Sequence, residues 1–124
     1  MINPDNCRFT KSHEWVSEDG TIGISDHAQK EITDVVFVDL PKPGRVVKAG
    51  EAVAVVESVK AAFDIYAPVS GKIKAVNSQL SKNPALVNQS PYGDGWLFSI
   101  EKNGNEDAAL MTHQTYQSFL SEEH

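Results

Sequence analysis

The stretch that decides the fold is AVAVVESVKAAFDIYAPVSG, residues 52–71. Its first five residues form a continuous apolar run, which is typical of a strand covered on both faces. Residues 63–68 are predicted to form a second strand, because β-branched and aromatic side chains recur until Pro68. The residues between the two strands, 58–62, therefore form a hairpin turn. Lys60 lies at or near this turn, and we expect its amine to project into solvent.

Further short strands are predicted on both sides of the hairpin. Turn residues separate candidate strands at 13–17, 21–25, 35–40, 71–77 and 96–101. The run at 35–40 is nearly as apolar as that at 52–56, so we expect both of these strands to be covered on both faces. Asp19-Gly20 stands between the first two strands and favours a tight N-terminal hairpin.

Helical signals are few and short. Ser25 can cap a helix over 26–32, and Asn105 and Thr112 can cap two more near the C-terminus. In the last of these, the apolar residues Tyr116, Phe119 and Leu120 have the i, i+3, i+4 spacing of one helix face. We expect this face to lie on the sheet.

The chain also repeats a short motif. LPKPGRV at 40–46 is similar to APVSGKI at 67–73, and both the prolines and the glycines of the two copies are 27 residues apart. We interpret the repeat as one strand-turn-strand device used twice, as in a sandwich with approximate two-fold symmetry. The alternative interpretation is a chance likeness between two ordinary turns.

Length, charge and cysteine content exclude several classes of protein. A chain of 124 residues is suited to a single domain spanning 1–124. The net charge of −6 disfavours a nucleic-acid partner, and no apolar run approaches the roughly 20 residues of a membrane span. A single cysteine, Cys7, and an opening without signal or transit character favour a cytoplasmic, bacterial location. A processed protein of the mitochondrial matrix would have the same features.

The residues around Lys60 resemble those of a known family. ESVKAA at 57–62, followed by IYAPVSG at 65–71, is similar to the lysine hairpin of the glycine cleavage system H proteins, which belong to the biotinyl/lipoyl-domain superfamily. The resemblance continues through SHEW at 12–15, GISDHAQ at 23–29, DVVFVDLP at 34–41, LVN at 86–88 and PYGDGW at 91–96. It implies a mostly β fold, a flattened β sandwich or barrel-sandwich hybrid with pseudo-two-fold symmetry, an N-terminal hairpin and short peripheral helices including the C-terminus.

The resemblance further implies a non-catalytic carrier with lipoic acid amide-linked to Lys60. The lipoyl arm would take an aminomethyl group from glycine decarboxylase, a pyridoxal phosphate enzyme, to the aminomethyltransferase, which uses tetrahydrofolate. Dihydrolipoyl dehydrogenase would then reoxidise the dithiol. Lipoate-attaching enzymes would be further partners, with Glu57, Ser58, Val59 and Ala61 as their recognition residues. The small size and acidic surface favour a monomer that meets these enzymes transiently.

A sheltering pocket for the arm is also implied by the resemblance, with Ser12, Glu14 and Asp64 as its residues. An aminomethyl amine that loses its proton can expel the thiolate, whereas a protonated amine has no lone pair with which to do so. A nearby carboxylate favours the charged form of an amine. The alternative interpretation is that Glu14 and Asp64 are ordinary surface carboxylates. Phe63 stands where relatives have a small or polar residue, so the pocket mouth is expected to be narrower or more apolar.

Other interpretations of Lys60 fit less well. Biotin carriers have methionine on both sides of their lysine, whereas Lys60 has Val59 and Ala61. Lipoyl domains of 2-oxoacid dehydrogenases lack counterparts of the segments 13–15 and 93–96. A Schiff-base enzyme would need a desolvated amine, which a turn does not offer. An H-like protein that acts mainly as a lipoyl donor or relay to other lipoate-dependent complexes and a scaffold with an idle lysine both remain open. No catalytic or metal site is predicted, because the histidines have no metal-ligand spacing.

Overall fold

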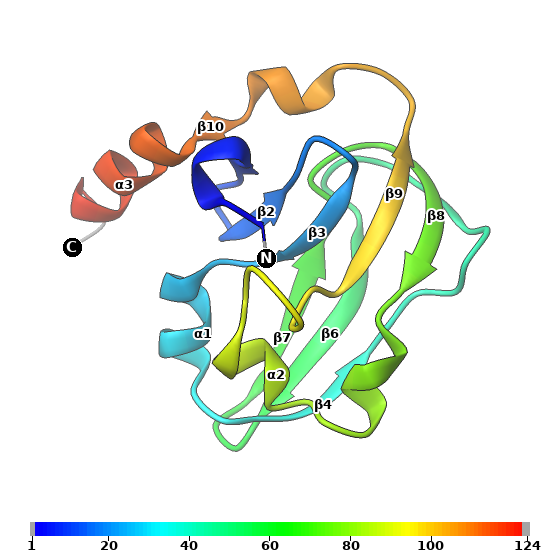
Figure 1. Cartoon of the computed structure of the whole chain (residues 1–124), viewed down its shortest axis with the longest axis vertical. Helices are drawn as coiled ribbons and strands as arrows, with labels where there is room; N and C mark the ends of the chain where they lie inside the picture. The colour runs from blue at the N-terminus through cyan, green and yellow to red at the C-terminus, as the bar shows by residue number, and fades with distance from the viewer. Residues whose placement is uncertain (1, 123–124) are drawn as a thin grey trace.

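Two antiparallel β-sheets make up most of the structure, a computed structural model that describes residues 2–122 (Figure 1). The larger sheet has the order β10 (Met111–Thr112), β1 (Arg8–Phe9), β2 (Glu14–Val16), β3 (Thr21–Ile24), β9 (Phe98–Lys102), β8 (Gly71–Val76) and β5 (Val46–Val47). The smaller sheet has the order β4 (Val35–Asp39), β6 (Ala52–Ser58) and β7 (Ala62–Tyr66).

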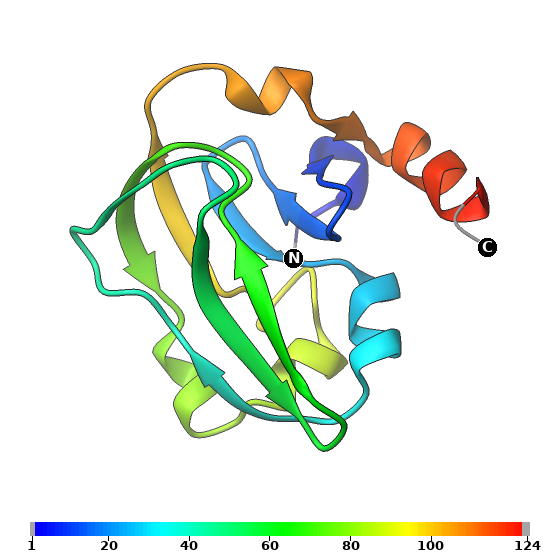
Figure 2. The same cartoon turned by 180° about the vertical axis from the view of Figure 1, so that it is seen from behind.

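The two sheets face each other in the view from behind (Figure 2), and their inner side chains form one buried core. Ile22, Ile73 and Phe98 of the larger sheet and Val56 and Ile65 of the smaller sheet belong to the same buried cluster. The described strands form two separate sheets and do not close into a barrel. The expected mostly β sandwich is therefore confirmed, with the N-terminal hairpin formed by β2 and β3.

Helices cover the periphery. They are α1 (Asp26–Ile32), α2 (Leu86–Gln89) and α3 (His113–Glu122), with 3₁₀ turns η1 (Pro4–Asn6), η2 (Ser78–Ser81) and η3 (Glu106–Ala109). Ser25 caps α1 as predicted, because its Oγ accepts from the backbone N of Ala28 at 3.1 Å. Asn105 precedes the 3₁₀ turn η3, and its side chain makes no capping hydrogen bond. Within residues 2–122, no helix combines the length and apolar character that crossing a membrane requires.

The C-terminal helix packs on a second apolar cluster beside β1 and β2. Tyr116 of α3 is buried, and its ring stacks on Phe9 with a centroid distance of 4.5 Å. Phe119 and Leu120 also pack against this cluster, so the predicted face of α3 is confirmed. Trp15 of β2 completes the cluster.

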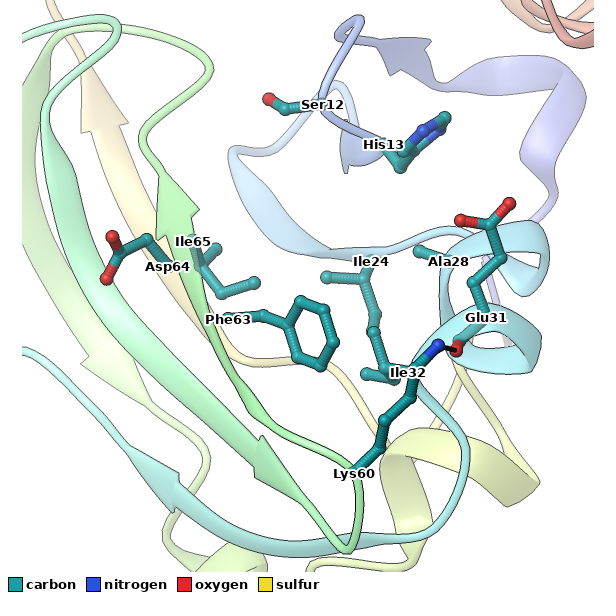
Figure 3. A pocket seen from close by; sticks show the side chains of 10 residues that line it. All are labelled: Ser12, His13, Ile24, Ala28, Glu31, Ile32, Lys60, Phe63, Asp64 and Ile65. Carbon is teal, nitrogen blue, oxygen red and sulfur yellow. Dashed lines mark hydrogen bonds between the residues drawn. The ribbon is translucent and has the colours of Figure 1, made fainter. Parts of the chain in front are cut away.

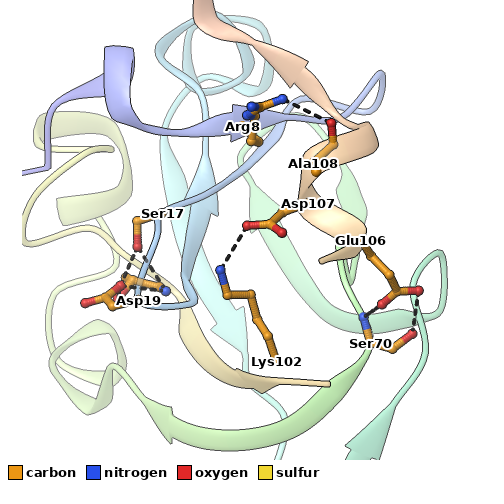
Figure 4. A network of polar contacts seen from close by, with 9 residues as sticks. Arg8, Ser17, Asp19, Ser70, Lys102, Glu106, Asp107 and Ala108 are labelled. Carbon is orange, nitrogen blue, oxygen red and sulfur yellow. Dashed lines mark hydrogen bonds and ion pairs between the residues drawn. The ribbon is translucent and has the colours of Figure 1, made fainter. Parts of the chain in front are cut away.

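A set of polar contacts fixes the segment that leads from β9 to α3 (Figure 4). Lys102 pairs with Asp107 at 2.9 Å, and Arg8 donates to the carbonyls of Ala108 and Leu110 at 3.2 and 3.1 Å. This segment lies at the opposite end of the molecule from the turn between β6 and β7 (Figure 1). The turn therefore lies away from η3, β10 and α3 (Figure 1).

The repeated motif corresponds to two segments that pair with each other. Val46 lies opposite Lys72 in the antiparallel pair of β5 and β8, and the backbone N of Gly44 donates to the carbonyl of Ile73 at 2.8 Å. Gly44 has a φ of +93°, a conformation that favours glycine. Equivalent strands beside a two-fold axis are expected to meet in this way.

One expectation about burial is wrong. The strand at 35–40 was expected to be covered on both faces, but Val36 is 53% and Phe37 is 52% exposed. β4 is an edge strand, and its pairing with β6 shifts register between Val35 and Phe37. Sequence patterning also missed β1, β5 and β10, which have only two residues each.

Candidate functional site

The turn between β6 and β7 is fixed by its own hydrogen bonds. The backbone N of Ser58 donates to the carbonyl of Ala61 at 2.8 Å. The Oγ of Ser58 accepts from the backbone N of Lys60 at 3.1 Å and from that of Ala61 at 3.2 Å. Val59 N also donates to the carbonyl of Asp34 at 3.0 Å, which ties the turn to the segment between α1 and β4. Lys60 is thus an exposed residue on an ordered turn.

The Lys60 side chain lies against the end of α1 instead of projecting freely into solvent. Its Nζ donates to the carbonyl oxygen of Glu31 at 3.3 Å (Figure 3). The last carbonyls of a helix have no partners within the helix, and this end carries partial negative charge. An ammonium group is therefore well suited to this position.

A cavity of about 170 Å³ adjoins Lys60 (Figure 3). Its lining comes from the loop before β2, β3, α1, the turn between β6 and β7, and β7, namely Ser12, His13, Ile24, Ala28, Glu31, Ile32, Lys60, Phe63, Asp64 and Ile65. The ring of Phe63 faces Ile24 and Ile32, so part of the wall is apolar. Ser12 and Asp64 also belong to the lining, with the carboxylate of Asp64 pointing away from Phe63 and Ile65 on the exposed face of β7 (Figure 3).

Glu14 lies behind Ser12 and is only 1% exposed. Its Oε1 accepts from the hydroxyls of Thr10 at 2.5 Å and Ser12 at 2.6 Å, and its Oε2 accepts from the backbone N of Tyr66 at 3.2 Å. Burial raises the pKa of Glu14, while these hydrogen bonds act in the opposite direction. Glu14 therefore links β2 to β7 and orients the Ser12 hydroxyl.

The structure brings together most of the residues selected from the sequence. Lys60, Ser12 and Asp64 line one cavity, and Glu14 contacts it through Ser12. Sequence reasoning missed His13 and Glu31. Glu31 has a readable signal, because Ala28, Glu31 and Ile32 have the spacing of one helix face. No sequence pattern marks His13, because its position in the cavity lining depends on a backbone φ of +75°.

A small sandwich that presents a lysine on an ordered, exposed hairpin has the architecture of a carrier domain. The model of the family described as "Glycine cleavage H-protein" matches residues 7–123. The chain belongs to this family, and it is a non-catalytic, lipoyl-carrying subunit of the glycine cleavage system.

Individual relatives agree with this assignment. The chain is 63% identical over 120 residues to the glycine cleavage system H protein of Deinococcus deserti, covering 94% of this chain and 100% of that protein. It is 53% identical to the H protein of Thermotoga maritima, covering 94% and 97% of the two chains. The crystal structure of a glycine cleavage system H protein from Mycobacterium marinum superposes with a TM-score of 0.87 at 35% identity, covering 96% of this chain and 99% of that one.

Proposed function

We propose that Lys60 is the lipoyl attachment residue. The observation that supports this most directly is the geometry of its turn, where Ser58 and Asp34 hold the backbone while the lysine stays exposed. An enzyme that modifies one lysine among several needs it at a fixed address, and an ordered turn lowers the entropy lost on binding. Exposure also argues against the desolvated amine of a Schiff-base enzyme.

Attachment is an acyl transfer to the Nζ atom. The neutral amine of Lys60 attacks the carbonyl carbon of an activated lipoyl donor, an amide bond forms, the activating group leaves and the amine loses a proton. The attaching enzyme is proposed to recognise the flanking residues Glu57, Ser58, Val59 and Ala61. Acylation removes the ammonium charge that now faces the carbonyl of Glu31, so the arm is released from α1.

The lining of the cavity supports its use by an arm of this kind. When bound, lipoate supplies a disulfide that accepts the aminomethyl group and carries it as a thiol adduct. Phe63, Ile24 and Ile32 offer an apolar wall to hydrocarbon and sulfur. Asp64 and Ser12 are proposed to hold the amine in its protonated form, with Glu14 orienting Ser12 from behind.

The proposed partners are the other enzymes of the glycine cleavage system. We infer that the chain, as a monomer of the bacterial cytoplasm, moves the aminomethyl group from glycine decarboxylase to the tetrahydrofolate-dependent aminomethyltransferase. Dihydrolipoyl dehydrogenase then reoxidises the arm. Relatives from Deinococcus and Thermotoga that bear the same system's name support the bacterial setting.

A reconstitution with matched variants tests the attachment site. The wild type, Lys60→Arg and Lys72→Arg are incubated with labelled lipoate and an attaching enzyme, and then with glycine decarboxylase and glycine. Lys72 is an exposed lysine of β8 and serves as the control. We expect label and release of CO₂ from the wild type and Lys72→Arg, and neither from Lys60→Arg. Labelling of Lys60→Arg would refute the assignment.

The sheltering role of the cavity is tested separately by the lifetime of the loaded arm. Asp64→Asn and Ser12→Ala should shorten the lifetime of the aminomethylated protein. Asp39→Asn changes an exposed carboxylate in the same row of the smaller sheet, opposite Val55, and should leave the lifetime unchanged. Equal lifetimes for all four proteins would show that the cavity does not protect the amine.

A further inference from the structure

Three exposed apolar side chains gather beside the Lys60 turn. They are Val36 at 53%, Phe37 at 52% and Val59 at 69% exposure, and we call them the β4 patch. Phe37 lies opposite Glu57 on β6, and Val59 is joined to Asp34 by its backbone hydrogen bond. β4 runs beside β6 up to the turn (Figure 2). The patch and Lys60 therefore share one end of the smaller sheet.

The backbone of β4 is shaped to expose this patch. Side chains alternate between the two faces in a regular strand, so two successive residues are not both exposed on an otherwise covered sheet. The register shift between Val35 and Phe37 inserts one extra residue and breaks the alternation. Bulges of this kind often redirect side chains next to functional sites. The exposure of Val36 and Phe37 thus follows from a local feature of the fold.

Charged residues around the patch indicate the chemistry of its partner. Asp34, Asp39 and Glu57 are exposed carboxylates on or next to β4 and β6. Glu31, near the end of α1, is also exposed. An apolar centre that includes an aromatic ring, with a polar rim, is typical of a protein interface, and here most of the charged rim residues are acidic. The complementary surface has an apolar pocket surrounded by basic side chains.

The position of the patch selects one of the possible partners. An enzyme that acylates Nζ must enclose the Lys60 side chain, so it has to contact the residues next to the turn. Enzymes that act on the far end of a long arm have no such requirement. We propose that the β4 patch is the docking surface for the enzyme that acylates Lys60, with Phe37 as the anchor. This inference rests on the proposed function of Lys60. It adds residues of β4 to the turn residues that the acylating enzyme is proposed to contact.

The test measures acyl transfer to variants of the patch. Val36→Thr, Phe37→Thr and the double variant keep β-forming side chains while removing apolar surface. Val46→Thr is the matched control, because Val46 is 70% exposed but lies on β5 of the larger sheet. We expect kcat/KM for acylation of the double variant to fall about tenfold through KM, and that of Val46→Thr to stay unchanged. Denaturant midpoints show that each variant is folded.

The outcomes separate this inference from the attachment site. Acylation of the double variant at the wild-type kcat/KM would overturn the docking surface while leaving Lys60 in place. An equal loss in Val46→Thr would also overturn it, since the effect would not be local. Normal acylation followed by impaired CO₂ release from glycine would assign the patch to the decarboxylase instead. Acylation of Lys60→Arg would instead refute the proposed function itself.

Discussion

Removing the carboxylate of Glu14 should both destabilise the fold and disturb the cavity. The side chain is 1% exposed and accepts hydrogen bonds from Thr10, Ser12 and the backbone N of Tyr66. Hydrogen bonds to a charged group contribute about 1.5–3 kcal/mol each, and part of this offsets the cost of burying the charge. We therefore expect Glu14→Ala to lower the free energy of unfolding by about 3 kcal/mol. At about 4 °C per kcal/mol, Tm should fall by about 12 °C.

The conservative change Glu14→Gln should cost less, about 1 kcal/mol, because an amide oxygen still accepts from the Tyr66 N–H. The hydroxyls of Thr10 and Ser12 can rotate to accept from the new amide N–H. This variant has no carboxyl group to titrate. It therefore isolates the effect of the Glu14 charge.

The pH dependence of stability has a definite sign. Burial raises the pKa of Glu14 above its ordinary value of 4.5, so the folded chain holds this proton more tightly than the unfolded chain. The contribution of Glu14 to stability is fully present below the unfolded value and is lost as pH rises through the folded pKa. Urea unfolding of the wild type and Glu14→Gln is measured from below pH 4.5 to neutral pH. The wild type should lose stability relative to Glu14→Gln as pH rises, and parallel curves would refute the reasoning.

Three further predictions follow from other parts of the fold. Acylation of Lys60 removes the ammonium that faces the carbonyl of Glu31, so amide hydrogen exchange in α1 should become measurably faster, by up to about fivefold. Unchanged exchange would contradict a capping role. In Gly23→Ala the new Cβ would lie 2.7 Å from Cζ2 of the buried Trp15, so the free energy of unfolding should fall by about 2 kcal/mol. An unchanged denaturation midpoint would argue against this close packing. Cys7 is 3% exposed, and burial, with a smaller effect of Asp19, raises the pKa of its thiol to about 11. A thiol reagent should label Cys7 slowly in the native protein near neutral pH and rapidly in urea, whereas rapid native labelling would show that the thiol is accessible.

The sequence predicted the elements whose signals are local. The apolar runs, the Asp19-Gly20 turn and the Ser25 cap each specify their own structure, and the corresponding strands, hairpin and helix form where expected. Two-residue strands were missed because their pairing depends on the rest of the sheet. The exposure of Phe37 was also missed, because a bulge on an edge strand leaves no mark in the pattern of apolar residues.

In the candidate site, too, some features could be predicted from short segments and others depend on tertiary contacts. The strand pattern placed Lys60 on its turn, and the family resemblance selected Ser12 and Asp64. The fold brings all three to one cavity. The role of Glu14 behind Ser12 depends on its burial and on the N–H of Tyr66, which is 52 residues away in the chain. The contact between Lys60 and the end of α1 is likewise tertiary. Such contacts follow from packing and not from any short segment.

Peptide mapping by mass spectrometry tests the central claim most directly. The wild-type chain is incubated with lipoate and an attaching enzyme, digested, and its lysine-containing peptides are compared with those of the untreated protein. We predict a lipoyl adduct on Lys60 and on no other lysine. An adduct on a different lysine, with Lys60 unmodified, would contradict the account.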